Sequence, residues 1–140
     1  MRASAWAILA GALAIGACNS SISELEQSEG AARAEVEFNE NYLVVYQRVR
    51  KIALQCRDGN VGATASLEID NELYDELGCG EVTSRLNSIG LNSYNYQIRI
   101  ERTGPSRSIL RVVSGGTVNN QIAIDIVTGW AQGSLRCDGL

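Results

Sequence analysis

Alternation of apolar with polar residues is the feature that most constrains the fold of this chain. The clearest run is Tyr94 to Glu101, YNYQIRIE, in which every second residue is apolar. Similar runs cover residues 34–38, 65–70, 82–86 and 109–113. A period of two predicts β-strands with one apolar and one polar face. Such strands are typical of an antiparallel sheet that has one face in water.

Two segments instead have helical spacing. From Tyr42 to Cys56 the apolar residues recur every three or four positions, and Asn41 is suited to cap the first turn. The segment after residue 116 is ambiguous, because Ile122, Ile124 and Ile126 alternate as in a strand. A helical stripe also runs through it as far as Trp130 and stops before Gly133, with Thr117 or Asn119 as the cap. We therefore predict a second helix there.

These elements predict one α+β domain over residues 34–140. Its order is β-α-β-β-β-β-α, with two helices on one face of an antiparallel sheet. This arrangement resembles the helix-grip architecture, which also occurs in a lipoprotein subunit of the outer-membrane barrel-assembly machinery. The stretch ELYDELGCGEV, Glu72 to Val82, also resembles small uncharacterised lipoproteins of proteobacteria. The latter resemblance implies no catalytic residue.

The first 17 residues predict a signal peptide. Arg2 is followed by an uncharged run from Ala3 to Ala17. As a helix this run spans about 22 Å, short of the roughly 30 Å of a hydrocarbon core. The run ends in Ile15-Gly16-Ala17-Cys18, which resembles the bacterial lipobox. An ordinary cleavage that leaves Cys18 as a thiol is the alternative, although Ile15 is a poor small residue for it.

The lipobox implies acyl chains on Cys18, palmitate among them, and therefore a membrane partner through the N-terminal lipid. Residues 18–33 are then the lipidated cysteine and a flexible polar tether. Asn19, in place of Asp, implies the outer membrane, with the domain facing the periplasm of the bacterial cell envelope.

The charge of the mature chain is acidic. Of the 12 basic and 16 acidic residues only Arg2 lies in the signal segment, which leaves a net charge of about −5 at neutral pH. Nucleic acid is therefore not an expected partner, because its phosphates need basic residues. The charges come in alternating acidic and basic blocks, which predicts that they meet on neighbouring solvated strands.

Residues for catalysis or metal binding are sparse. The chain has no histidine and no C-x-x-C pair, so we predict no metal, no cofactor and no enzymatic activity. Lys51, the only lysine, is on the polar side of the first helix. The carboxylates of Asp70, Glu72, Asp75 and Glu76 are interpreted as a solvated rim. The larger aromatic side chains are assigned to the core: Tyr42, Tyr46, Tyr94, Tyr96 and Trp130.

Export makes a disulfide possible. With Cys18 acylated, three pairings remain among Cys56, Cys79 and Cys137. If both helices pack on one sheet face, Cys56 and Cys137 can approach within the roughly 4.4–6.8 Å between Cα atoms that a disulfide needs. We therefore predict Cys56–Cys137, with Cys79 in a glycine turn as a free thiol.

Two functions remain open. The first is a lipid-anchored periplasmic binding or accessory protein that acts through contacts with an envelope protein partner. The alternative is a carrier of a small apolar ligand or lipid in a groove between sheet and helices. An open apolar pocket of at least about 300 Å³ would indicate the carrier. A filled core with an exposed apolar patch would indicate the interaction protein.

Overall fold

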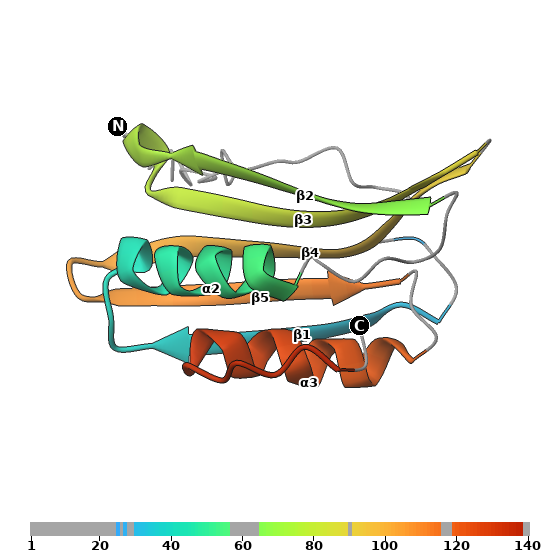
Figure 1. The fold of residues 1–140 in the computed structure, drawn as a ribbon. Coiled ribbons are helices and arrows are strands. Elements are labelled where there is room, and N and C mark those ends of the chain that lie inside the picture. Colours follow the sequence, from blue (N-terminus) through green and yellow to red (C-terminus); the bar gives the residue numbers. More distant parts are fainter. Residues whose placement is uncertain are drawn as a thin grey trace, which may run out of the picture.

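The computed structural model of the protein describes residues 25, 27, 30–56, 65–89, 91–115 and 119–138. Its strands are β1 (Ala32–Phe38), β2 (Ala65–Tyr74), β3 (Cys79–Ser88), β4 (Leu91–Gly104) and β5 (Arg107–Ser114). Its helices are α2 (Tyr42–Cys56), the 3-10 turn η1 (Asp75–Leu77) and α3 (Asn120–Ala131). The predicted α+β class and the order of the elements are confirmed (Figure 1).

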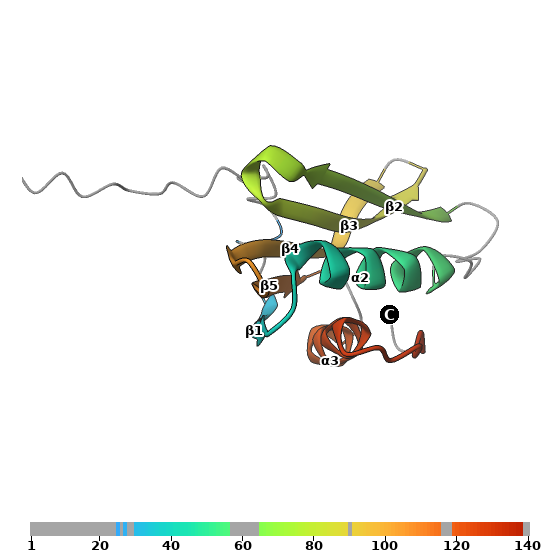
Figure 2. The same ribbon diagram turned by 90° about the vertical axis from the view of Figure 1, so that its left-hand side faces the viewer.

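The strands form one antiparallel sheet with the order β1-β5-β4-β3-β2. β2 to β5 follow one another as a meander, whereas β1 pairs with the last strand of the chain. The connection through α2 therefore crosses the sheet from the edge at β1 to the edge at β2. Figure 2 shows α2 and α3 side by side on the same face of the sheet, as predicted.

Both helices begin at an asparagine cap. The Asn41 side chain accepts a hydrogen bond from the Leu43 amide at 2.9 Å. The Asn119 side chain accepts one from the Ile122 amide at 3.1 Å, which settles the ambiguous segment as a helix. Each bond satisfies a first-turn N–H that has no partner within its helix. Thr117, the other predicted cap, lies outside the described residues.

The core fills the space between the helices and the sheet. Trp130 of α3 is fully buried, and its ring meets Tyr96 of β4 edge-on at 5.8 Å between centroids. On α2, Tyr46 lies directly over Gly80 of β3, where an added Cβ would come within 2.4 Å of the Tyr46 ring. The other fully or nearly buried apolar side chains of this core are Tyr42, Val45, Val49, Ile52, Ala53, Val82, Ile98, Ile100, Leu110, Val112, Ile124, Ile126, Val127 and Ala131.

Tyr94 corrects the prediction that all five aromatic residues belong to this core. The β3–β4 register pairs Ser84 with Tyr96 but Arg85 with Tyr94, so Asn95 forms a β-bulge. One extra residue reverses the alternation of side chains beyond it. Tyr94 therefore packs on the second face of the sheet, against a cluster formed by Leu25 and Val113.

The second face is also more covered than the sequence predicts. Leu25, placed in the flexible tether by its sequence context, is only 4% exposed and packs against Val113. β1 begins at Ala32, so Ala32 and Arg33 belong to the sheet and not to the tether. Glu81 and Gln97 are buried on this face as well. The prediction that this whole face is in water is therefore wrong at its centre.

Candidate functional site

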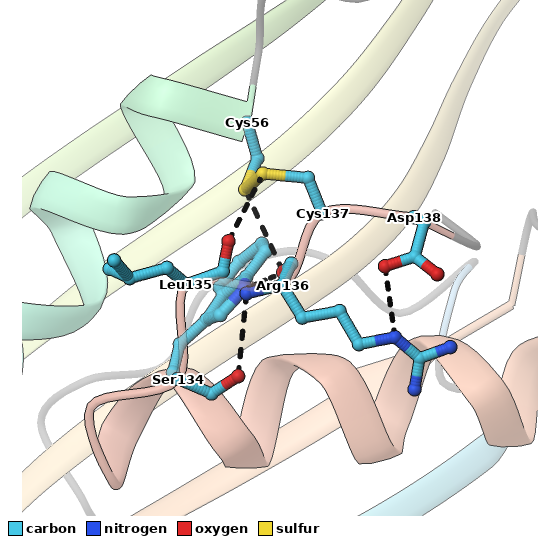
Figure 3. Close-up of polar contacts among 7 residues, drawn as sticks. Cys56, Ser134, Leu135, Arg136, Cys137 and Asp138 are labelled. Atoms are coloured by element: carbon cyan, nitrogen blue, oxygen red, sulfur yellow. Dashed lines mark hydrogen bonds and ion pairs between the residues drawn. A yellow bond between two sulfur atoms is a disulfide. The ribbon is translucent and has the colours of Figure 1, made fainter.

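The predicted cysteine pair lies where the ends of the two helical segments meet. Cys56 is the last residue of α2, and Cys137 follows α3 in the C-terminal segment 132–138. The structure places their sulfur atoms at bonding distance, 2.07 Å, with the Cα atoms 5.3 Å apart (Figure 3). The chain reaches this position because Gly133 adopts a positive φ of 94° just after α3, a conformation that favours glycine.

A hydrogen bond from α3 holds the C-terminal segment at this point, and a second bond lies within the segment. The buried Trp130 side chain donates from Nε1 to the Arg136 carbonyl at 2.7 Å. Arg136 donates from Nε to Asp138 at 2.9 Å, and this bond lowers the pKa of the Asp138 carboxyl (Figure 3). The disulfide, the indole and the segment together close the open end of the helix pair. This arrangement is structural and offers no group for chemistry on a substrate.

The other two cysteines differ from this pair. Cys79 is disulfide-bonded in the structure, so the prediction of a free thiol is wrong. The sequence placed Cys79 in a glycine turn, whereas the structure makes it the first residue of β3, on the second face of the sheet and 2% exposed. Cys18, the predicted lipidation site, lies outside the described residues.

The carboxylates interpreted as a rim have ordinary structural partners. Asp70 lies 3.3 Å from Arg85, and Asp75 accepts a hydrogen bond of 2.5 Å from Tyr42. Glu72 accepts from Tyr74, and this bond raises the pKa of that phenol to about 12. Glu76 is exposed to solvent, as is Lys51 on α2. This arrangement is that of a solvated rim.

An acidic row runs along β2, at the edge of the sheet. Glu68, Asp70 and Glu72 are all exposed on the face turned away from the helices. Arg85 on β3 is the base that faces this row, at 2.9 Å from Glu68 and 3.3 Å from Asp70. Arg85 carries one positive charge, whereas the row carries three carboxylates. The row therefore keeps a net negative charge. We call these three carboxylates the acidic edge.

Exposed apolar side chains follow the acidic edge at the end of β2 and in the turn after it. Leu73 is 45% exposed, Tyr74 is 36% exposed and Leu77 is 51% exposed. We call these three residues the apolar corner. Leu73 lies on the helix-facing side of β2 and Tyr74 on the other side. Three exposed large apolar side chains within five residues of the chain mark this corner as a candidate contact site.

The turn that carries the apolar corner is firmly held. The Tyr42 hydroxyl at the start of α2 bonds Asp75, and burial together with this bond raises the pKa of Tyr42. The Arg102 amide of β4 donates to the Gly78 carbonyl at 2.8 Å. The Arg102 guanidinium also lies 5.9 Å from the centre of the Tyr42 ring, within range of a cation–π contact. A helix and a strand of the core thus fix the position of the corner.

A surface hollow lies at the hairpin between β4 and β5. It has a volume of about 440 Å³ and is lined by Arg102, Thr103, Gly104 and Pro105 at the β4–β5 hairpin. It is shallow and open to solvent, and it lies at the tip of the hairpin, apart from the buried core between sheet and helices.

Comparison with known proteins finds no family model and no curated protein that matches the chain. Within the part of the chain that the structure describes, no helix has the length and apolar character needed to cross a membrane. The same part holds no group of three or more acidic or cysteine side chains arranged to hold a metal ion.

The sequence pattern alone does not predict the apolar corner. It ended the strand at Asp70, whereas β2 continues to Tyr74. The missed signal is that Leu73 keeps the period of two set by Leu67 and Ile69, with Asn71 as the one polar interruption. Asn71 fits there because its side chain accepts a hydrogen bond from Arg50 of α2 at 2.7 Å.

Proposed function

We propose that this protein is a lipid-anchored protein of the bacterial cell envelope that acts by binding another protein. The observation that carries the proposal is the exposed apolar corner beside the acidic edge. A carrier would need room for its ligand between sheet and helices, where Trp130, Tyr96 and Tyr46 are buried. These buried side chains occupy part of the space where the ligand of a carrier would bind, which supports the interaction function over the carrier.

The lipid anchor is supported by the resemblance of Ile15 to Cys18 to a lipobox. Several acyl chains on one cysteine would hold a folded domain at a membrane without a spanning helix. The absence of Asp at position 19 supports the outer membrane as its location. An accessory role fits a domain that presents a rigid surface and lacks histidine for acid–base chemistry at neutral pH.

Membrane fractionation of a Cys18→Ser variant tests the anchor. The variant loses the thiol that would be lipidated, so we expect it to leave the membrane fraction and to become soluble. Ser20→Ala changes a neighbouring small polar residue and should stay in the membrane fraction. If Cys18→Ser stays with the membranes as the wild type does, the anchor is wrong.

Mass spectrometry of the purified wild-type protein provides a second test of the lipid anchor. A mature chain that begins at Cys18 and carries the mass of acyl chains would support the anchor. The same measurement distinguishes lipidation of Cys18 from a Cys18–Cys79 disulfide, because a sulfur bound to a glyceryl carbon cannot also be in a disulfide. An unmodified Cys18 would contradict the proposal.

A further inference from the structure

We propose that β2 accepts an extended segment of the protein partner as an added strand, and that basic residues alternate with apolar residues in this segment. The inference rests on the proposed function and names the chemistry of its partner. Addition of a strand to a free sheet edge is a common mode of peptide recognition, in which backbone bonds give affinity and alternate side chains give specificity.

The first step is the free edge itself. β2 ends the strand order and, among the described residues, pairs with β3 alone (Figure 1). It is 10 residues long, and its register with β3 has no shift. Its sequence, ASLEIDNELY, contains neither Pro nor Lys, the residues that often block a sheet edge. A regular row of backbone donors and acceptors therefore remains for another strand.

The second step is the charge of the face turned away from the helices. An added strand would place every second side chain beside Glu68, Asp70 and Glu72 of the acidic edge. Arg85 is shared by the first two of these carboxylates. Basic side chains of the partner would supply the missing positive charge, because opposite charges on adjacent strands attract.

The third step is the face turned toward the helices. On this side β2 presents Leu67 and Ile69, both partly buried, and then the exposed Leu73. The remaining side chains of the added strand would lie against these residues and near the apolar corner. They are therefore expected to be apolar, which gives the partner segment a period of two.

A second copy of the chain is a poor occupant of this edge. Antiparallel pairing of two β2 strands about their centres would set Asp70 opposite Asp70 and Glu68 opposite Glu72. Like charges directly opposite one another on paired strands are destabilising. At the other edge, β1 has 7 residues and carries both signs of charge, Arg33, Glu35 and Glu37. The acidic edge is thus matched to a basic partner.

Synthetic peptides test the inference on the full-length protein, purified from membranes in a neutral detergent. The probe is a ten-residue peptide that alternates Lys with Val. One control peptide alternates Glu with Val, and another has the same five Lys and five Val in two separate blocks. We expect the alternating Lys peptide to bind at least about tenfold more tightly than either control. On binding, hydrogen exchange should slow in residues 65–74 and stay unchanged in α3.

Charge reversal supplies the matched variants. The double variant Asp70→Lys, Glu72→Lys should weaken the Lys peptide at least about tenfold and should gain binding of the Glu peptide. The double variant Glu35→Lys, Glu37→Lys makes the same change on the exposed face of β1 and should bind as the wild type does. All four side chains are exposed, and each double variant loses one exposed ion pair, Asp70–Arg85 or Glu35–Arg111, so similar and small losses of stability are expected in both.

Several outcomes would overturn the inference: equal binding of the alternating and blocked Lys peptides, protection away from β2, equal loss in both double variants, or a dimer of the free protein joined through β2. The proposed function fails separately. If the protein is lipidated and binds an envelope protein but the peptide results fail, strand addition alone is wrong. If Cys18→Ser stays in the membrane while the peptides bind as expected, the anchor alone is wrong.

Discussion

At the scale of single residues, one missing side chain decides how closely α2 approaches the sheet. Gly80 lies on the helix-facing side of β3, and Tyr46 occupies the space above it. Any larger residue would meet the aromatic ring, since Tyr46 is itself 4% exposed and surrounded by core side chains. Buried aromatic rings contribute much of the contact area of a core, so their positions are costly to change.

Gly80→Ala is therefore expected to lower the free energy of unfolding by about 1–3 kcal/mol, the usual cost of overpacking a core. The added Cβ would lie 2.4 Å from the Tyr46 ring, and the helix would have to shift. Gly104→Ala is the matched control, because its Cβ would meet Arg107 at 3.6 Å, an ordinary contact. Urea denaturation of both variants measures the difference, and equal stabilities would contradict the tight packing of α2.

At the scale of elements, α2 and α3 are joined by contacts between residues distant in sequence. Arg48 of α2 donates to the Ala131 carbonyl at 2.6 Å and pairs with Glu40 at 2.5 Å. The hydrogen bond and the ion pair lower the pKa of Glu40. At the other end of α2, the Cys56–Cys137 pair ties the C-terminal segment to the helix. Residues distant in sequence thus join α2 to α3 near the middle of α2, through Arg48, and join α2 to the segment after α3 at its last residue, Cys56.

The disulfide variants test this fastening. The pair closes a loop with a sequence separation of 81 residues. In the chain-entropy model such a bridge contributes about 4.5 kcal/mol by restricting the unfolded chain. Cys56→Ser and Cys137→Ser should then lower the free energy of unfolding by similar amounts, and the double variant should lower it by little more than either. Additive losses, or a peptide map that joins Cys56 to another cysteine, would contradict the pairing.

At the scale of the whole molecule, the sheet has two covered regions rather than one. The larger is the core beneath the helices, and the smaller is the cluster of Leu25 and Val113 on the second face, with Tyr94 packed against it. Ion pairs across the strands flank this cluster, among them Arg99–Glu81 and Arg111–Glu35. Acidic and basic residues thus meet on neighbouring strands as predicted, whereas the burial of Glu81 departs from the prediction that these strands are solvated. Burial raises the pKa of Glu81, although Arg99 opposes this shift.

Leu25→Ala tests whether the second face is covered in solution. Leu25 is 4% exposed, so its truncation should lower the free energy of unfolding by about 2 kcal/mol or more. Leu135→Ala is the control, because Leu135 is 72% exposed and should change stability by less than about 0.5 kcal/mol. Thermal unfolding of both variants measures this. A wild-type stability for Leu25→Ala would show that the polar segment is a free tether, as the sequence predicts.

The sequence by itself determined the fold class, the first helix with its asparagine cap, the position of the second helix, and the close approach of Cys56 to Cys137. These features follow from local periodicity and from the ends of two helices on one face, which are readable along the chain. The tertiary structure decided the features that depend on strand register and on which strands lie side by side. The bulge at Asn95 turned Tyr94 to the second face, and β3 placed Cys79 among covered residues. The apolar corner is exposed because β2 is an edge strand, and strand order is a property of long-range pairing that no local pattern contains.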